Sequence, residues 1–151
     1  WDAINGVIVA ARTVMDYIKD VGAVYADANK HMEWVTPTNW LVMQSYNEVE
    51  KRRISSLING NTIQLKLNVD IPNQVSKRRT SSGASPNFIH SMDASAMTKT
   101  INTCKLQGIT DFAMVHDSYG THTSEMPRLS DVLRQEFVQM YTEHDVLTEL
   151  R

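Results

Sequence analysis

The sequence predicts an α+β fold in which helices pack around a small antiparallel sheet. Apolar residues recur at helical spacing over residues 3–20 and again over residues 125–141. Between them, two runs of alternating apolar and polar residues flank an Asn-Gly pair, which is the pattern of a β-hairpin. With 151 residues, 42% of them hydrophobic, the chain can build a core as one domain or as a piece of a larger one.

Composition argues against several classes of protein. The formal net charge of -2 and the charged fraction of 21% exclude a histone-like basic protein. The lone cysteine, Cys104, excludes an intrachain disulfide framework and a zinc ribbon. No apolar run is long enough to span a membrane, and no signal-peptide pattern opens the chain. Because the chain opens at Trp1 without a methionine, we expect a processed or excised segment.

Charge is distributed unevenly along the chain. Residues 48–80 contain seven basic and three acidic groups, a net of +4, whereas residues 111–151 contain three basic and eight acidic groups, a net of -5. A local basic stretch can contact phosphates or can simply be a solvated surface, and charge alone leaves both interpretations open.

The first element is predicted to be an amphipathic helix over residues 3–20, whose apolar stripe is typical of a core-facing surface. The Asp20-Val21-Gly22 sequence is expected to end it, and a second short helix is expected over residues 24–30. Pro37 then favours an extended path through the residues before it.

A β-hairpin is predicted from residues 53–58 and 62–69, joined by a type I′ turn at Asn59-Gly60, where both residues tolerate positive φ. This register gives the hairpin one polar, cationic face, on which Arg53 lies opposite Lys66 and Ser55 lies opposite Gln64. Apolar residues alternate onto the other face, which is expected to rest on the protein body: Ile63, Leu65, Leu67 and Val69.

The remaining elements follow from turn-forming residues and apolar periodicity. Residues 76–86 are expected to form a polar connection, followed by a helix over residues 87–107 that Gly108 ends. Residues 111–117 are then expected to form a short buried strand, residues 118–121 a turn, and residues 125–141 a second strongly amphipathic helix.

Asp117 is the first candidate functional residue, because it follows an apolar strand and precedes a glycine-containing turn. A carboxylate held there can bind a hard cation such as Mg²⁺, or can simply cap the turn. A transition-metal site would instead use His116 and His122, completed from His31, His90, His144 or Cys104, although the spacing fits no standard zinc pattern. Ser118 as a nucleophile is a further alternative, although no nucleophile elbow surrounds it.

A second polar group lies around residues 86–95. Asn87, His90, Ser91 and Asp93 are expected in the first turns of a helix, where exposed N–H groups and the helix dipole favour anions. Ordinary N-capping with a hydrogen-bonded histidine is the alternative.

These residues together resemble the single-subunit, bacteriophage-type DNA-directed RNA polymerases, whose relatives serve mitochondria and chloroplasts. The resemblance depends on two motifs in the family's order and spacing: Gly83-x-x-Pro86-Asn87-Phe88-Ile89-His90-Ser91-x-Asp93-Ala94-Ser95 and Val115-His116-Asp117-Ser118-Tyr119-Gly120-Thr121. Weaker similarity includes Trp34-Val35-Thr36-Pro37, Gln44-x-Tyr46 and the N-terminal helix, so most of the 151 residues are covered.

The resemblance implies part of a right-hand polymerase architecture. Residues 1–33 would be a helical fingers segment, residues 34–85 an extended and hairpin segment, and residues 86–151 a palm segment with a metal-binding motif. The enzyme would be a nucleotidyltransferase acting in transcription. Its partners would be template and promoter DNA, the RNA transcript, nucleoside triphosphates and the rest of the polymerase chain, with no membrane.

The resemblance also implies roles for the motif residues. Asp117 would be one of two catalytic aspartates and would bind two Mg²⁺ ions, one at the RNA 3′-hydroxyl and one at the incoming nucleotide's phosphates. His116 would lie close to the growing RNA end, and His90 would contact the RNA:DNA hybrid through its minor groove.

In the phage enzymes, a β-hairpin at this place reads promoter bases in the DNA major groove. The resemblance therefore implies that the polar face specifies the promoter, through Arg53, Ser55, Gln64, Lys66 and Asn68. We expect Arg78 and Arg79 to be further nucleic-acid contacts. A phage enzyme would work in the cytoplasm of an infected or lysogenic bacterium, which we expect in preference to an organelle.

The chain departs from the family at two motif positions and lacks part of its site. The family often has histidine where Ala96 stands and a polar residue where Met92 stands. The second metal-binding aspartate, the nucleotide-binding lysine and arginine, and the ribonucleotide-selecting tyrosine would precede Trp1. Because one carboxylate cannot hold a two-metal site, we expect the 151 residues alone to be inactive.

Two other functions stay open at the level of sequence. The basic hairpin and the Lys77-Arg78-Arg79 run could form a nucleic-acid-binding module that acts on its own, with an affinity that falls steeply with salt. A related polymerase that copies DNA would share the palm chemistry, although the Pro-Asn-Phe-Ile-His-Ser motif argues against it.

Overall fold

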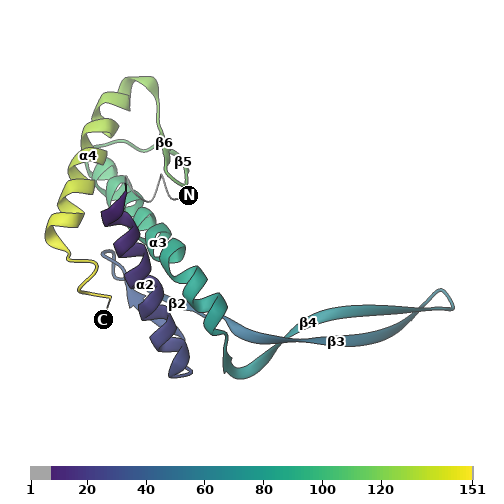
Figure 1. The fold of residues 1–151 in the computed structure, drawn as a ribbon. Helices are drawn as coiled ribbons and strands as arrows, with labels where there is room; N and C mark the ends of the chain where they lie inside the picture. The colour runs from purple at the N-terminus through teal and green to yellow at the C-terminus, as the bar shows by residue number, and fades with distance from the viewer. Residues whose placement is uncertain (1–7, 151) are drawn as a thin grey trace. The chain divides into compact units, whose positions relative to one another are not determined.

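The computed structural model describes residues 8–150, which contain three α-helices, one 3-10 helix and six strands (Figure 1). The predicted α+β class is confirmed. The strands form three two-stranded sheets, β1–β2, β3–β4 and β5–β6, where a single small sheet was expected. None of the helices in the described range is long and apolar enough to cross a membrane. The elements in chain order are α2 (Val9–Asp27), β1 (Met32–Val35), β2 (Leu41–Gln44), β3 (Asn47–Ile58), β4 (Asn61–Val75), α3 (Lys77–Leu106), β5 (Ala113–Val115), β6 (Ser118–Gly120), η1 (Thr123–Glu125) and α4 (Met126–Glu143).

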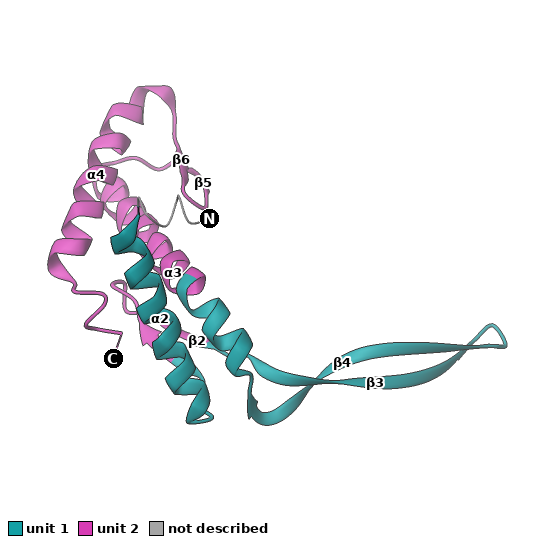
Figure 2. Ribbon diagram, viewed as in Figure 1, with its two compact units in different colours: residues 1–32, 44–85 teal, residues 33–43, 86–151 magenta. Residues whose placement is uncertain are grey.

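The chain divides into two compact units (Figure 2). Unit 1 consists of residues 1–32 and 44–85, and unit 2 consists of residues 33–43 and 86–151. Unit 1 therefore contains α2, the β3–β4 hairpin and the beginning of α3. Unit 2 contains the rest of α3, the β5–β6 hairpin and α4.

In unit 1, α2 is one continuous helix, so the prediction of a helix end at residues 20–22 and a separate short helix was wrong. Gly22 lies inside α2 because of packing: a Cβ atom there would lie 3.1 Å from the Cβ of Ala84 in α3. Among the described residues of the predicted apolar stripe, Ile18 is buried, whereas Ile8 and Met15 are exposed, so only the end of the stripe faces the core. Residues 3–7 of the predicted helix lie outside the described residues.

The beginning of α3 also differs from the prediction, because residues 77–86 are helical where a polar connection was expected. Small side chains explain the difference: Thr80, Ala84 and Ser85 are buried, and the Ser81 hydroxyl donates a hydrogen bond to the carbonyl of Lys19 in α2 (3.2 Å). Close packing on α2 thus outweighs the weak local preference of serine and threonine for a helix.

The β3–β4 hairpin has the predicted turn and register. Asn59 and Gly60 have φ angles of 50° and 77°, and Arg53 faces Lys66 while Ser55 faces Gln64. The expectation that the apolar face rests on the protein body was wrong within unit 1, because Leu65 is 47% exposed and Ile63 and Leu67 are similarly open. Both faces of this ribbon are accessible in the unit to which it belongs.

In unit 2, α3 ends as predicted at Gly108, which has φ of 90°. The N–H of Gly108 donates to the carbonyl of Lys105 (3.0 Å) and that of Ile109 donates to the carbonyl of Cys104 (3.0 Å), which together form a Schellman motif. Cys104 and Ile109 are buried in one core cluster with two residues of α4, Leu129 and Val132. The helix end and the core of this unit therefore depend on each other.

The β5–β6 hairpin replaces the predicted buried strand and following turn. The turn consists of residues 116 and 117, where residues 118–121 were expected, and Val115 is 64% exposed, so the strand is not buried. Gly120 is the last residue of β6, and a Cβ atom there would come within 3.2 Å of the carbonyl oxygen of Ala113 on β5. The predicted helix over residues 125–141 is confirmed as α4, within two residues at each end.

The packing of α2 on α3 gives a stability prediction. Replacing Gly22 with valine should destabilise the chain by about 1–3 kcal/mol, because the added side chain has no room beside Ala84. Ala11→Val, at an exposed position of the same helix, should cost about 0.5 kcal/mol. Urea unfolding measures both, and equal losses would show that the Gly22 contact is unimportant.

Candidate active site and nucleic-acid interface

Asp117 occupies a two-residue turn between β5 and β6, next to the facing pair Val115 and Ser118. Its neighbour His116 has φ of 53°, and among residues 8–150 every other residue with positive φ is asparagine or glycine. A residue other than glycine in this region costs of order 1–3 kcal/mol and is found preferentially at functional sites. Both side chains are exposed, so the turn presents the Asp117 carboxylate with oxygens available to a ligand.

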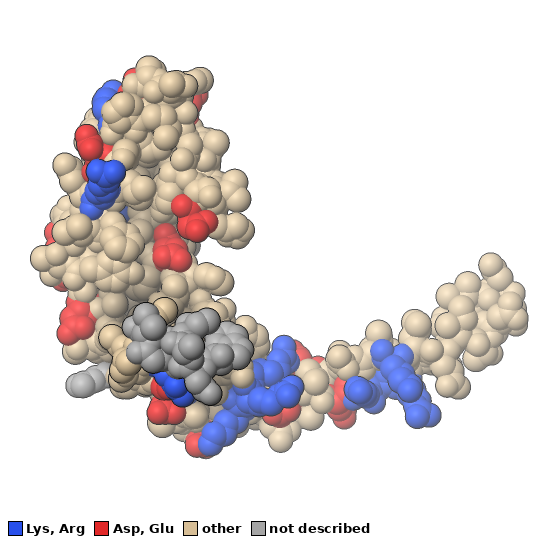
Figure 3. Space-filling view, turned by 45° about the horizontal axis from the view of Figure 1, so that its top comes forward, with Lys and Arg blue, Asp and Glu red and all other residues tan. Residues whose placement is uncertain are grey.

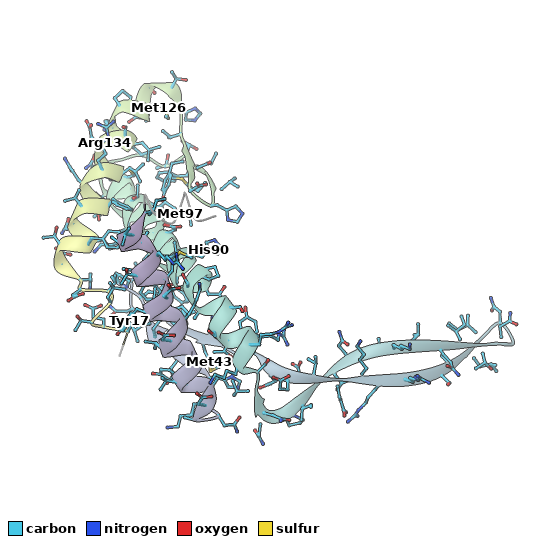
Figure 4. All side chains as sticks on the ribbon, in the orientation of Figure 1. Tyr17, Met43, His90, Met97, Met126 and Arg134 are labelled. Carbon is cyan, nitrogen blue, oxygen red and sulfur yellow. The ribbon has the colours of Figure 1, made fainter. Side chains whose placement is uncertain are left out.

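Asp117 lines two clefts in unit 2. The larger, of about 730 Å³, brings His116 and Asp117 together with four residues of α3: His90, Asp93, Ala94 and Met97. The smaller, of about 390 Å³, is mostly apolar and is lined by Asp93, Ala96, Asp117, Tyr119, Leu133, Arg134, Phe137 and Val138. Figure 4 shows His90 and Met97 on α3 and Arg134 on α4.

The α3 residues of the first motif lie in the middle of the helix, because α3 begins at Lys77. The expectation of an anion site or an N-cap at a helix start around Asn87 was therefore wrong. Ser91 has a structural role: its hydroxyl donates to the carbonyl of Phe88 (2.7 Å) and accepts from the indole N–H of Trp34 (2.9 Å). His90 lines the larger cleft together with Asp93, three residues further along the helix.

Asp93 and Asp117 influence tyrosines of the same unit. Burial raises the pKa of Tyr119, and the negative charges of Asp93 and then Asp117 raise it further. Burial and the charge of Asp93 likewise raise the pKa of Tyr141. The sequence placed Asp93 in the second polar group and in the first family motif but predicted no metal or catalytic role for it, although its spacing of three from His90 on a helix was a usable signal. Nothing in the sequence singled out Arg134.

The carboxylates at the clefts suit a hard cation, since Mg²⁺ prefers oxygen ligands and usually completes its shell with water and phosphate oxygens. No group of three or more His, Cys, Asp or Glu side chains placed to hold a metal ion is found among residues 8–150. A Mg²⁺ ion bound by Asp117 would therefore take further ligands from water, phosphates or other parts of a polymerase.

Three candidate ligands of the transition-metal alternative have other surroundings. His122 lies 3.7 Å from the carboxylate of Asp111, and His144 lies 3.3 Å from that of Glu149. Cys104 is buried in the core, and burial raises the pKa of its thiol, which disfavours a thiolate ligand. Ser118 opens β6, and within the described residues no hydrogen bond joins it to a histidine. Among residues 8–150, neither alternative therefore finds an assembled site.

In unit 1, the β3–β4 hairpin carries a polar, cationic face. Arg53, Ser55, Gln64, Lys66 and Asn68 are all exposed and share this face in the observed register. Figure 3 shows Lys and Arg side chains gathered along the hairpin and at its base. Arg52 lies on the opposite face, where its guanidinium pairs with Glu50.

The basic run at the start of α3 is largely engaged within unit 1. Lys77 forms an ion pair with Asp27 (2.7 Å). Arg79 donates a hydrogen bond to the carbonyl of Asn47 (3.1 Å), and its guanidinium lies 5.2 Å from the ring centroid of Tyr46. Arg78 is exposed. Contact with nucleic acid stays a prediction for Arg78 and Arg79.

Comparison with known proteins identifies the class to which this fold and these motifs belong. Residues 1–151 match the family described as DNA-dependent RNA polymerase. The chain is 34% identical over 141 residues to the chloroplastic/mitochondrial DNA-directed RNA polymerase 2 of Arabidopsis thaliana, covering 93% of this chain and 13% of the relative. It is 30% identical over 149 residues to the DNA-directed RNA polymerase of Pseudomonas phage phiKMV, covering 99% of this chain and 18% of the relative.

The chain therefore belongs to the phage-type, single-subunit DNA-directed RNA polymerase family. A mitochondrial polymerase of Nicotiana sylvestris is also similar, with 33% identity over 92% of this chain and 13% of the relative. The 151 residues thus span less than one fifth of the length of these three relatives. Since both phage and plant organellar enzymes are similar, the expected preference for a phage over an organelle is not supported.

The tyrosine environments give a prediction that does not require catalysis. Asp93→Asn should lower the pKa of both Tyr119 and Tyr141, whereas Asp117→Asn should lower only that of Tyr119, because Asp117 does not act on Tyr141. NMR titration of ¹³C-labelled tyrosine rings measures each group. Because its tyrosine pKa is raised, the folded state binds the phenol proton more tightly than the unfolded chain does. The resulting stabilisation is fully present at pH values below the ordinary tyrosine pKa of 10.0, and it is lost as the pH rises through the pKa of the folded state.

Asp131→Asn, at an exposed position of α4, is the control and should move neither tyrosine. If Asp117→Asn moved both tyrosines equally, the assignment of separate carboxylate effects would be wrong.

Proposed function

We propose that this chain forms the palm and promoter-hairpin part of an RNA polymerase that adds ribonucleotides to an RNA 3′ end on a DNA template. The observation that carries the proposal is the exposed Asp117 turn, which shares a cleft with His90, Asp93 and His116 in a chain of this family. We assign residues 86–151 to the palm, residues 34–85 to the extended and hairpin segment, and residues 1–33 to the fingers.

Asp117 is proposed to hold Mg²⁺ through its carboxylate. When bound, a pair of such ions stabilises the attacking and leaving oxygens of phosphoryl transfer together. The positive φ of His116 and the β5–β6 pairing fix where that carboxylate lies. Binding of cations is further favoured because Asp93 adds a second negative charge to the same cleft.

His90 and His116 are proposed to contact nucleic acid at this cleft. His90 is exposed on α3 and its ring can exchange hydrogen bonds with the 2′-hydroxyls displayed in the minor groove of an A-form hybrid. His116 is proposed to lie near the RNA 3′ end, because it is the residue adjacent to Asp117 in the turn. Template DNA, transcript and nucleoside triphosphates are the corresponding partners.

The β3–β4 hairpin is proposed to read promoter bases in the major groove, which admits a two-stranded ribbon. Its polar face offers donors and acceptors suited to base edges and carries the cations Lys51, Arg53 and Lys66. The acidic residues Glu50 and Asp70 do not interrupt this central stretch, since Glu50 faces the other way and Asp70 lies nearer the base. A phage enzyme would do this in the bacterial cytoplasm, and an organellar enzyme in a mitochondrion or chloroplast.

The alternatives receive less support. A polymerase that copies DNA is not favoured, because the similar proteins named above are all DNA-directed RNA polymerases. Nucleic-acid binding by the 151-residue chain alone would rely on the hairpin cations, and it would be recognised by an affinity that falls steeply with salt.

The catalytic role of Asp117 is tested in a full-length polymerase that contains these residues. Asp117→Asn should lower radiolabelled nucleotide incorporation by at least about 10²–10³-fold, the usual cost of losing a group that stabilises transition-state charge. Asp111→Asn, which changes an exposed carboxylate outside the two clefts around Asp117, should leave incorporation unchanged. The 151-residue chain alone should incorporate nothing, and retained activity of the Asp117 variant would refute the role.

The promoter role is tested by exchanging Arg53 and Lys66 for the residues of another phage enzyme in the full-length polymerase. Promoter preference should change by about 1–3 kcal/mol in discrimination for each base contact altered. Exchange of Arg52, which lies on the opposite face of the same ribbon, should leave preference unchanged. Unaltered preference in the Arg53 and Lys66 variant would contradict the proposal.

A further inference from the structure

Among the described residues of unit 1, the β3–β4 hairpin is supported only near its base. Its two faces are accessible along the ribbon, and Leu57 near the tip is 71% exposed. The faces of the ribbon are therefore not packed against the described residues of unit 1. Its direction is therefore determined by the contacts at the end where it joins α2 and α3.

The base of the hairpin contains a bulge. Asn47 faces Val75 and Val49 faces Asp70, so the single residue between 47 and 49 lies opposite residues 71–74. Asn73 within this bulge has φ of 57°. A bulge bends and twists the ribbon and leaves backbone groups without partners on the facing strand. Residues outside the ribbon must satisfy those groups if the bend is to have a fixed angle.

Asn29 satisfies two of them from the end of α2. Its side-chain Nδ2 donates to the carbonyl of Asn73 (2.8 Å), and its Oδ1 accepts from the N–H of Val75 (2.9 Å). Asn29 itself has φ of 52° and follows the last turn of α2, where the N–H of Lys30 donates to the carbonyl of Tyr25 (2.9 Å) in a Schellman motif. One side chain therefore ties the helix end both to the bulge and to Val75, where strand pairing resumes after it.

The other strand is held from α3. The Arg79 guanidinium donates to the carbonyl of Asn47 and lies over the ring of Tyr46. The N–H of Ser76, just before α3, donates to the carbonyl of Tyr46 (2.8 Å). The start of β3 and the end of β4 are thus each fixed to a different helix of unit 1.

We propose that Asn29 is a positioning residue. Together with Arg79, it holds the hairpin at a defined angle to the helices of unit 1, and so sets promoter selectivity without touching a base. This inference rests on the proposed promoter role of the hairpin. Because the ribbon is long, a small change of angle at its bulge moves the base-reading face by a much larger distance. Extension of RNA at the Asp117 site does not require promoter reading, so the two activities should separate.

Asn29→Gly is the sharpest variant. Glycine is the residue most favoured at the end of a Schellman motif, so α2 keeps its cap while both side-chain bonds to β4 are lost. Asn39→Gly is the matched control, since Asn39 also has positive φ (60°) but lies in the turn before β2 and contributes no side-chain bond to the hairpin.

In the full-length polymerase, Asn29→Gly should lower promoter-dependent initiation roughly ten- to a hundredfold, because misplacement of about 1 Å by a remote substitution can cost that much. Extension of an RNA primer already annealed to template should change less than about twofold, which is within the range of neutral substitutions. Asn39→Gly should alter neither rate. Hydrogen exchange of the Val75 amide should also become faster in the Asn29 variant.

The outcomes separate this inference from the proposed function. If Asn29→Gly leaves initiation intact while exchange of Arg53 and Lys66 changes promoter preference, the positioning role is wrong and the promoter role stands. If neither variant alters promoter use, both are wrong. If initiation and primer extension fall together, Asn29 supports folding in general and the positioning role is again refuted.

Discussion

The contact between Gly22 and Ala84 is the constraint on which unit 1 depends. With no side chain at position 22, α2 approaches the first turns of α3 closely enough to bury Thr80 and Ser85. That approach keeps residues 77–85 helical despite their weak preference for a helix. It also brings the ends of two helices to the base of the hairpin, where Asn29 and Arg79 hold the strands. The position of the hairpin within unit 1 therefore depends on this contact between the two helices.

Several left-handed residues shape the hairpin and the Asp117 turn. Asn59 closes the hairpin, Asn29 and Asn73 form its base, and His116 turns the chain so that Asp117 is exposed. Asparagine and histidine tolerate positive φ better than most residues and still carry a side chain that can bond. Glycine at position 29 would relax the backbone but would remove both hydrogen bonds to β4. The choice of residue at this place thus reflects the side chain as much as the backbone.

The two units suit different ligands. The hairpin of unit 1 carries exposed cations on one face, as a surface for a polyanion requires, whereas the clefts of unit 2 contain the carboxylates Asp93 and Asp117. The small net charge of -2 averages these opposite regions and hides both. The candidate site was predicted from the sequence as far as its motif residues, His90, His116 and Asp117. The place of Asp93 beside Asp117, and that of Arg134, were not predicted, because they depend on how α3, α4 and the β5–β6 hairpin pack.

The sequence by itself determined the features that depend on a few adjacent residues. The Asn59-Gly60 turn and its register, the end of α3 at Gly108 and the extent of α4 are of this kind, since backbone preference and apolar periodicity act locally. Tertiary structure decided the rest. Gly22 was expected to end a helix, but it lies inside α2, where a Cβ atom would lie 3.1 Å from the Cβ of Ala84 in α3. A contact between residues far apart in the sequence decided that position, because burial stabilises the helix more than local propensity opposes it.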